Sequence, residues 1–362
     1  MKETRVFVTD CEGPISKNDN AFELACHFVP EGEKFFTQVS RYDDVLADVV
    51  KRDGYKAGDT LKLIVPFFKA YGVTEQKMTE FSAQNIMLMP GALEALQFLK
   101  ERMPCFIVST SYEHYIRTLC SVLGFPYENA YCTKLDIDAY RLSVEEQNKL
   151  RGFRQEICAL PLIEVPEEAK SLQDLSSRDR QTVKRLDDIF WKEISTMKIG
   201  AVFEEVNPVG GAEKAKAARN IVDRMNAGLG DVMYVGDSIT DVECFRLIRE
   251  KGGITISFNG NAYAVREAEI AVLSTNAIVV AVLADVYNKH GREAVYRFVD
   301  EWGYESLKKY GLAPWLCEKV LGVFPEKLPP VCRITEGNVQ ALAVESGAFR
   351  RMVRGERVGW LG

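Results

Sequence analysis

Short apolar runs alternate with helical patterns along most of this chain, and this alternation constrains its fold more than any other feature. The apolar runs cover residues 5–9, 105–108, 232–235, 254–257 and 270–273. Helical patterns lie between them, over residues 92–100, 215–225 and 242–249. Strands that alternate with helices form parallel sheets with helices on both faces. The sequence therefore predicts an α/β fold with a doubly wound parallel sheet.

Two helical stretches interrupt this alternation. Residues 16–88 follow the first strand and carry apolar positions at helical spacing, and residues 139–197 are charge-rich and mostly helical. We expect both to be insertions into the α/β core. The segments expected to form that core are 1–15, 89–138 and 198–285.

The C-terminal extension, residues 286–362, carries no motif. It becomes irregular around three prolines and then enters a basic stretch. We interpret the arginines of this stretch as a solvated terminal segment, with docking of a protein partner through the extension as the alternative. They are Arg350, Arg351, Arg354 and Arg357.

The composition excludes several classes of function. The 362-residue chain has a formal net charge of −6, so it offers no general basic field for a nucleic-acid backbone. Its nine cysteines are odd in number and scattered, which is typical of a reducing compartment. The apolar run 277–284 is too short to cross about 30 Å of hydrocarbon. We expect a cytoplasmic protein that binds neither nucleic acid nor membrane.

Two carboxylates follow the first predicted strand. Asp10 and Glu12 are two residues apart, which directs both side chains to one side, and Gly13 lets the backbone turn away. Ligands of doubly wound sheets bind beyond the carboxyl ends of the strands. One carboxylate can therefore attack a substrate there while the other transfers protons.

A second pair of carboxylates follows the strand 232–235. Asp237 ends this strand and Asp241 lies about one helical turn later. Oxygen ligands of this kind suit Mg²⁺, which would relieve the repulsion when a carboxylate attacks a phosphate. Ser109, at the end of the second strand, and Lys214 can supply donors to the phosphoryl oxygens.

Each of these features has a plain structural explanation when it is taken alone. Asp and Gly at strand ends are common turn formers, a serine there is often a cap, and one lysine carries no signal. The order of the four features along the chain favours the functional interpretation.

This ordered set resembles the four motifs of the haloacid dehalogenase superfamily over about residues 5–275. Met89-Pro90-Gly91-Ala92, Leu123-Gly124-Phe125 and the spacing of Lys214 from Asp237 are most similar to the phosphoserine phosphatases. The resemblance implies that residues 16–88 form a cap over the active site.

The resemblance also implies a role for each site residue. Asp10 would be the nucleophile, Glu12 the acid and base, and Ser109 and Lys214 the phosphate ligands, with Lys216 as the alternative to Lys214. Asp10, Asp237 and the backbone carbonyl of Glu12 would bind Mg²⁺, with Asp241 in support.

The sequence departs from the family pattern at two positions, because Glu12 stands for the usual aspartate and Pro14 for the usual threonine. The opening Asp10-Cys11-Glu12-Gly13-Pro14, with the C-terminal extension, also resembles a poorly characterised archaeal branch of the superfamily. Glutamate adds one methylene to a group whose placement matters for proton transfer.

Three hypotheses follow. The first is a Mg²⁺-dependent hydrolase of a small phosphorylated metabolite that forms an aspartyl phosphate. A phosphotransferase would use the same residues with an alcohol as acceptor. A catalytically weak regulatory subunit would keep the site and bind a protein partner through residues 139–197 and the extension.

Overall fold

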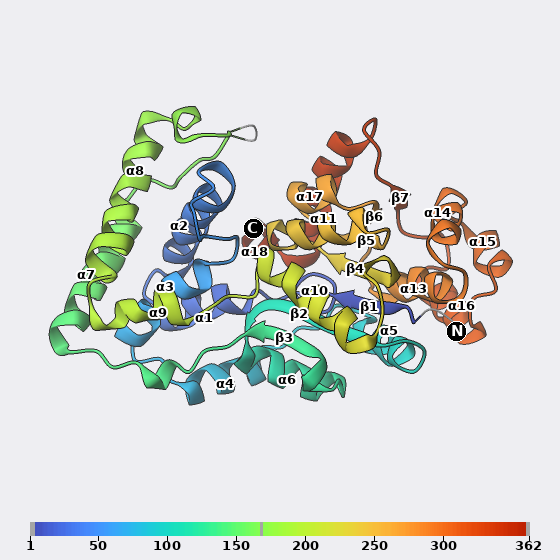
Figure 1. Cartoon of the computed structure of the whole chain (residues 1–362), viewed down its shortest axis with the longest axis horizontal. Coiled ribbons are helices and arrows are strands. Elements are labelled where there is room, and N and C mark those ends of the chain that lie inside the picture. The colour runs from blue at the N-terminus through green and yellow to red at the C-terminus, as the bar shows by residue number, and fades with distance from the viewer. Residues whose placement is uncertain (1–3, 167–168, 360–362) are drawn as a thin grey trace.

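The computed structural model describes residues 4–166 and 169–359 (Figure 1). Residues 1–3, 167–168 and 360–362, which belong to the core, the second insertion and the extension, lie outside the described part. A seven-stranded sheet forms the centre of the fold, in the order β3-β2-β1-β4-β5-β6-β7. Its strands are β1 (Val6–Thr9), β2 (Cys105–Tyr112), β3 (Ala130–Thr133), β4 (Val232–Gly236), β5 (Ile254–Phe258), β6 (Ile270–Val272) and β7 (Val331–Arg333).

The first six strands are parallel, and β7 pairs antiparallel with β6. The chain moves from β1 outward to β3, returns to β4 beside β1, and moves outward on the other side. This reversal between β1 and β4 is the topological switch point, where doubly wound sheets bind their ligands. The predicted α/β fold class is confirmed.

Helices cover both faces of the sheet because alternate strand residues point to opposite sides. Phe7 packs on the face covered by α5 (Ala92–Lys100), α6 (Glu113–Leu123) and α13 (Ile278–His290). Val6 and Val8 pack on the other face, covered by α10 (Ala212–Met225), α11 (Val242–Glu250) and α12 (Ala262–Glu267).

The two predicted insertions share one apolar core beside the sheet (Figure 1). The first contains α1 (Asn20–Phe28), α2 (Gly32–Asp44), α3 (Thr60–Ala70) and α4 (Glu75–Gln84). The second contains α7 (Val144–Ala159) and α8 (Ser177–Asp188), and the short α9 (Val202–Glu205) follows it. Phe35 and Phe67 of the first insertion share a single cluster with Phe190 of the second. The two insertions are therefore one helical unit, from which α4 reaches back to α6 of the core.

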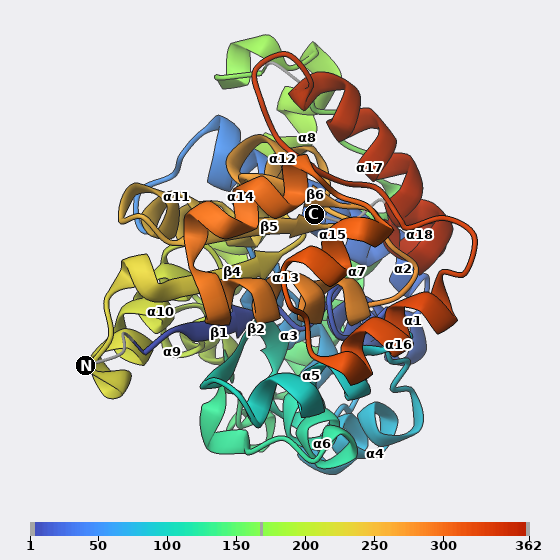
Figure 2. The ribbon, with the colours of Figure 1, turned by 90° about the vertical axis from the view of Figure 1, so that its right-hand side faces the viewer.

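The C-terminal extension is built into the fold. After α13 it forms α14 (Arg292–Asp300), α15 (Tyr304–Lys309) and α16 (Pro314–Val323), and then adds β7 to the sheet. The last helices are α17 (Val339–Arg354) and α18 (Glu356–Gly359), and α17 runs beside α12 (Figure 2). The interpretation of the basic stretch as a solvated segment is wrong for Arg350 and Arg354, whose side chains are both 3% exposed.

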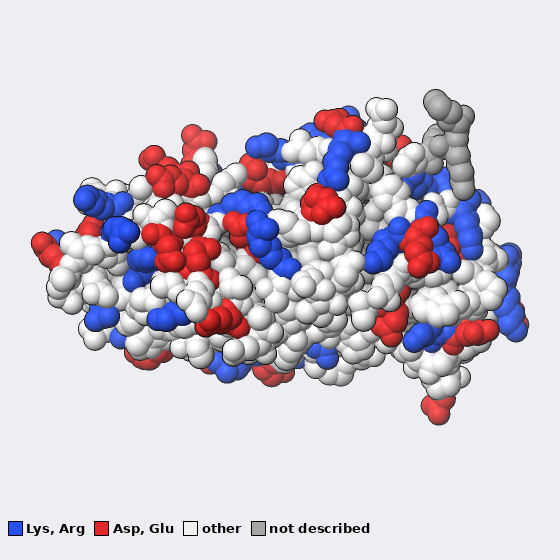
Figure 3. All heavy atoms as spheres, turned by 90° about the horizontal axis from the view of Figure 1, so that it is seen from below, with Lys and Arg blue, Asp and Glu red and all other residues white. Residues whose placement is uncertain are grey.

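The surface and the helices carry two further observations. Acidic and basic side chains are interspersed on the face shown in Figure 3. Within residues 4–166 and 169–359, no helix combines the length and the apolar character needed to cross a membrane.

Candidate active site

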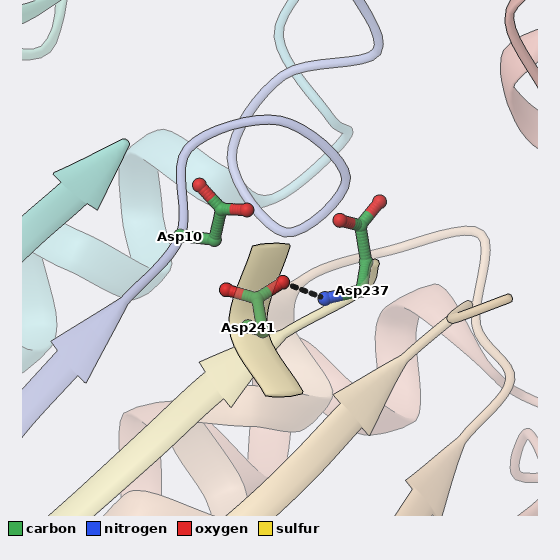
Figure 4. A group of neighbouring side chains, drawn as sticks. All are labelled: Asp10, Asp237 and Asp241. Carbon is green, nitrogen blue, oxygen red and sulfur yellow. Dashed lines mark hydrogen bonds between the residues drawn. The ribbon is translucent and has the colours of Figure 1, made fainter. Parts of the chain in front are cut away.

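Three carboxylates meet at the carboxyl ends of β1 and β4 (Figure 4). Asp10 directly follows β1, and its backbone N–H donates to the carbonyl of Val235 in β4 at 2.7 Å. Asp237 directly follows β4, and Asp241 lies four residues further on. Asp10, Asp237 and Asp241 are buried, and each offers an oxygen within 4.8 Å of those of the other two.

Two glycines make this close approach possible. A Cβ on Gly236 would lie 2.4 Å from the carboxyl carbon of Asp241. Gly13 has a φ of +97°, and a Cβ there would meet the Asp237 carboxylate. Larger residues would push the carboxylates apart, and the positive φ would strain any residue with a side chain.

Lys214, near the start of α10, links two of the carboxylates. Its Nζ lies 2.7 Å from Oδ2 of Asp10 and 2.8 Å from Oδ1 of Asp241, and its side chain is fully buried. Burial alone would lower the pKa of Lys214, but the charges of Asp10 and Asp241 raise it above its ordinary value. Lys216, the alternative to Lys214, is exposed and pairs with Glu213.

Asp241 is held by the core on both of its oxygens. Oδ1 also accepts a hydrogen bond from the Tyr234 hydroxyl at 2.6 Å, and Oδ2 accepts from the backbone N–H groups of Asp237 and Ser238, both at 3.0 Å. A carboxylate with this many donors is well suited to anchor the Asp237 turn and Lys214. The supporting role in metal binding that the resemblance implies for Asp241 stays a prediction.

Burial also changes the protonation of the two carboxyl groups after β1. It raises the pKa of Asp10 well above its ordinary value, although Lys214 opposes this effect. Burial, with a contribution from the charge of Asp19, raises the pKa of Glu12 to about 7. A carboxyl group with a pKa near neutrality can both donate and accept a proton.

The end of β2 places its hydroxyls differently from the prediction. The strand continues to Tyr112, beyond the predicted end at Val108, with a shift of register between these two residues. Ser109 is fully buried, and its Oγ accepts from the backbone N–H of Ser111 at 3.0 Å. The Ser111 hydroxyl donates to Glu12, and Thr110 and Ser111 line the site cavity.

A cavity of about 100 Å³ opens above these groups, between the sheet and the helical insertion. The insertion contributes Asp19, Phe36 and Leu61 to its walls, and α17 contributes Arg350 and Arg354. Residues 16–88 therefore supply part of the cavity wall, and their role as a cap stays a prediction.

The chain is similar to several solved structures. No family model and no curated protein matches it. The solved structure of gene product AF1437 from Archaeoglobus fulgidus matches with a TM-score of 0.79 and 26% identity, covering 99% of each chain. A phosphoserine phosphatase structure in apo form matches with a TM-score of 0.47 and 14% identity, over 77% of this chain and 98% of that one. A substrate-bound phosphoserine phosphatase complex matches with a TM-score of 0.46 and 15% identity, over the same shares.

The chain resembles the haloacid dehalogenase superfamily. The resemblance consists of the motif order together with the site geometry, since the structure brings Asp10, Lys214, Asp237 and Asp241 together at the switch point. The match to the archaeal protein extends over the C-terminal extension as well.

The C-terminal helix α17 supplies the site residues that the sequence analysis missed. Arg350 and Arg354 both contact Oδ2 of Asp237, the latter through Nη1 at 3.0 Å. Burial lowers the pKa of Arg350, although the charge of Asp237 counteracts this effect. One signal in the sequence points to them, because they lie one helical turn apart and continue the side of α17 that buries Leu342 and Ser346.

The donor set fits a divalent cation. All candidate ligand atoms are oxygens, as Mg²⁺ prefers. The Oδ1 atom of Asp237 accepts no hydrogen bond from any residue that the structure describes, while Oδ2 carries both ion pairs. Asp237 therefore keeps one oxygen that the arginines do not hold, and one of its two oxygens lies within 4.8 Å of an oxygen of Asp10.

Proposed function

We propose that this chain is a Mg²⁺-dependent phosphomonoester hydrolase in which Asp10 is the nucleophile. The observation that carries the proposal is the buried lysine between two carboxylates at the switch point. The Lys214 ammonium opposes the protonation of Asp10 that burial favours, and so stabilises the carboxylate form that would attack. The cavity lined by Asp10 can accommodate the phosphoryl group of a substrate.

In the first step a carboxylate oxygen of Asp10 attacks phosphorus, and the bond from phosphorus to the leaving oxygen breaks. Glu12, which lines the same cavity, gives its proton to the leaving alkoxide. In the second step Glu12 takes a proton from water, whose oxygen attacks the phosphorus of the aspartyl phosphate. Inorganic phosphate leaves and the Asp10 carboxylate is restored.

The remaining residues bind and orient. The Lys214 ammonium faces the nucleophile and can also neutralise phosphoryl oxygens. Thr110 and Ser111 line the cavity, where the Ser111 hydroxyl donates to Glu12 and the Thr110 hydroxyl to the carbonyl of Val209. These hydroxyls therefore orient the cavity wall and Glu12, whereas Ser109 supports this turn from within the core. A bound Mg²⁺ would supply charge neutralisation for the attack of an anion on an anion, held by Asp10, Asp237 and the Glu12 carbonyl.

The cavity size supports a small phosphorylated metabolite as the substrate. At about 100 Å³ it is small, which favours a small substrate over a large one. We expect a larger leaving group to need movement of the helical cap.

The test is phosphate release from a panel of small phosphomonoesters, with Mg²⁺ and with EDTA. We expect turnover that requires the metal and that disappears in Asp10→Asn. Lys214→Ala should also lose turnover, and Lys216→Ala, on the exposed side of the same helix, is its matched control. A folded chain that binds Mg²⁺ but releases no phosphate across the panel would favour the regulatory-subunit hypothesis.

A further inference from the structure

The C-terminal helix reaches the centre of the site through two buried arginines. Nη1 of Arg350 contacts Oδ2 of Asp237 and also lies 3.2 Å from the backbone carbonyl of the same residue. Nη1 of Arg354 contacts the same Oδ2 at 3.0 Å. Both arginine side chains are 3% exposed and the Asp237 side chain is 2% exposed. Two guanidinium groups thus meet on one oxygen of one carboxylate.

Stability alone does not account for this arrangement. Removing two guanidinium groups from water costs several kcal/mol per ion in round terms, and a buried ion pair often does no better than apolar packing. The arginines also lie in the wall of the cavity, where the surrounding carboxyl groups are numerous. A buried ion pair at such a place is better explained by what it does to the orientation of Asp237.

The two arginine contacts fix Oδ2 of Asp237 but do not involve Oδ1. Because Oδ2 accepts from both arginines, rotation of the carboxyl group would break two charge-assisted hydrogen bonds at once. Oδ1 accepts no hydrogen bond from the described residues, so its lone pairs stay available to a cation. Carboxylates that bind metals are held in this way by surrounding donors.

Arg354 also donates hydrogen bonds to the segment that leads into the first helical insertion. Its Nε donates to the carbonyl of Lys17 at 3.2 Å and its Nη2 to the carbonyl of Asn18 at 2.5 Å. These two residues lead directly into α1, the first helix of the cap. The position of Asp237 therefore depends on the C-terminal helix and on the segment that joins core and cap.

We propose that Arg350 and Arg354 are positioning residues that orient Asp237 for a divalent cation, so that the C-terminal helix completes the metal site. This inference rests on the proposed function only in taking Asp237 as a metal ligand. It assigns a role to the extension, for which the sequence motifs give none.

The experiment measures Mg²⁺ binding by calorimetry in the full chain without substrate, and repeats it with Mn²⁺ by electron paramagnetic resonance. We expect Arg350→Gln and Arg354→Gln to weaken the affinity by about 10- to 100-fold. Arg350→Lys, which keeps a cation beside Oδ2, should recover part of the loss. Arg351→Gln is the matched control. This substitution removes the same charge from the same helix turn, but the Arg351 side chain pairs with Glu356 at 3.8 Å and not with Asp237.

A second readout separates positioning from a structural role. If the arginines act through Asp237, high Mg²⁺ should restore the kcat of Arg354→Gln in any phosphatase assay, while the Mg²⁺ concentration for half-maximal rate rises. Thermal unfolding of each variant shows whether it is folded, and Arg354→Gln serves if Arg350→Gln does not fold.

The failures of the two proposals can be told apart. Unchanged or tighter Mg²⁺ binding in the folded arginine variants would overturn the inference, and tighter binding would show that the arginines compete with the cation. A wild-type chain that binds neither Mg²⁺ nor Mn²⁺ would overturn it as well. Weaker binding in the variants supports it even if no phosphomonoester is hydrolysed, an outcome that counts against the proposed function alone.

Discussion

Two buried clusters of cations and carboxylates lie side by side at the switch point, and they come from different parts of the chain. In the first, Lys214 of the core helix α10 joins Asp10 and Asp241 at 2.7 and 2.8 Å. In the second, Arg350 and Arg354 of the C-terminal helix α17 meet Asp237. Both place cations against buried carboxylates, whose charge would be costly to bury without a partner.

The difference between the clusters lies in what they touch. The lysine cluster includes Asp10, the carboxylate that would react, whereas the arginine cluster acts through Asp237 and the segment leading into the cap. We therefore expect the lysine cluster to control the chemical step and the arginine cluster to control the affinity for metal. Variants in the two clusters should therefore differ in whether added metal rescues them.

The largest expected effect is that of Asp10→Asn. We expect phosphate release to fall by about 10⁴-fold or more, because the amide is a poor nucleophile. High Mg²⁺ should not rescue this variant, in contrast to Arg354→Gln. Steady-state rates over a Mg²⁺ series measure both, and a metal-rescued Asp10→Asn would remove the distinction between the clusters.

Lys214→Ala tests the stability of the lysine cluster. It leaves Asp10 and Asp241 buried without their shared cation, so we expect unfolding to become easier by about 3 to 5 kcal/mol. Urea unfolding near neutral pH measures the change, with exposed Lys216→Ala as the control at less than about 0.5 kcal/mol. An equal loss in the two lysine variants would contradict a structural role for the buried pair.

The pH dependence of the free energy of unfolding tests the start of the first helical insertion, which lies beside the arginine cluster. The Glu23 carboxyl group accepts hydrogen bonds from the side-chain amide of Asn18. The backbone carbonyl of Asn18 in turn accepts a hydrogen bond from Arg354. Burial raises the pKa of Glu23 to about 7, from an ordinary 4.5. A raised folded-state pKa gives stability that is full below pH 4.5 and is lost as the pH rises through 7.

We therefore expect the wild type to lose about 2 kcal/mol more than Glu23→Gln between pH 4.5 and pH 7.5. The measurement is denaturant unfolding of both proteins across this range, and the difference between them removes the titration of all other groups. Parallel curves for the two proteins would show that Glu23 ionises normally in the folded chain.

The smallest expected effect is that of Arg357→Ala. Arg357 pairs with Glu33 of the cap, but the side chains are 59% and 53% exposed. Exposed pairs contribute about 0 to 1 kcal/mol, and Arg357 does not touch Asp237. We expect stability to change by less than about 1 kcal/mol and Mg²⁺ affinity to stay the same in calorimetry. A large loss of Mg²⁺ affinity would show that α18, as well as α17, contributes to the metal site.

Much of the core could be predicted from the sequence because its signals are local. Buried strands such as β1 and β4 are short apolar runs that end in an acidic residue, and this pattern locates both the strand and its functional end. Functional groups at the carboxyl ends of parallel strands share one edge of the sheet, and the observed strand order places β1 beside β4, which brings together Asp10 and Asp237.

The remaining features depend on contacts between distant segments. Amphipathic helices show which face is buried but not what covers it, so the common core of the two insertions was not predictable. A register shift in β2 decided that Ser111 rather than Ser109 faces the cavity. The arginines of α17 pair with Asp237 across 113 and 117 positions of sequence, and no local pattern encodes such a pair.

The most direct test of the central claim is to look for the phosphoryl group on Asp10. The chain would be mixed with Mg²⁺ and a hydrolysed phosphomonoester, quenched in acid during turnover, digested and mapped by mass spectrometry. We predict one phosphoryl group on the peptide that contains Asp10, removed by hydroxylamine and absent from Asp10→Asn. Steady phosphate release with no phosphoryl-protein, or with the phosphoryl group on another residue, would contradict the account.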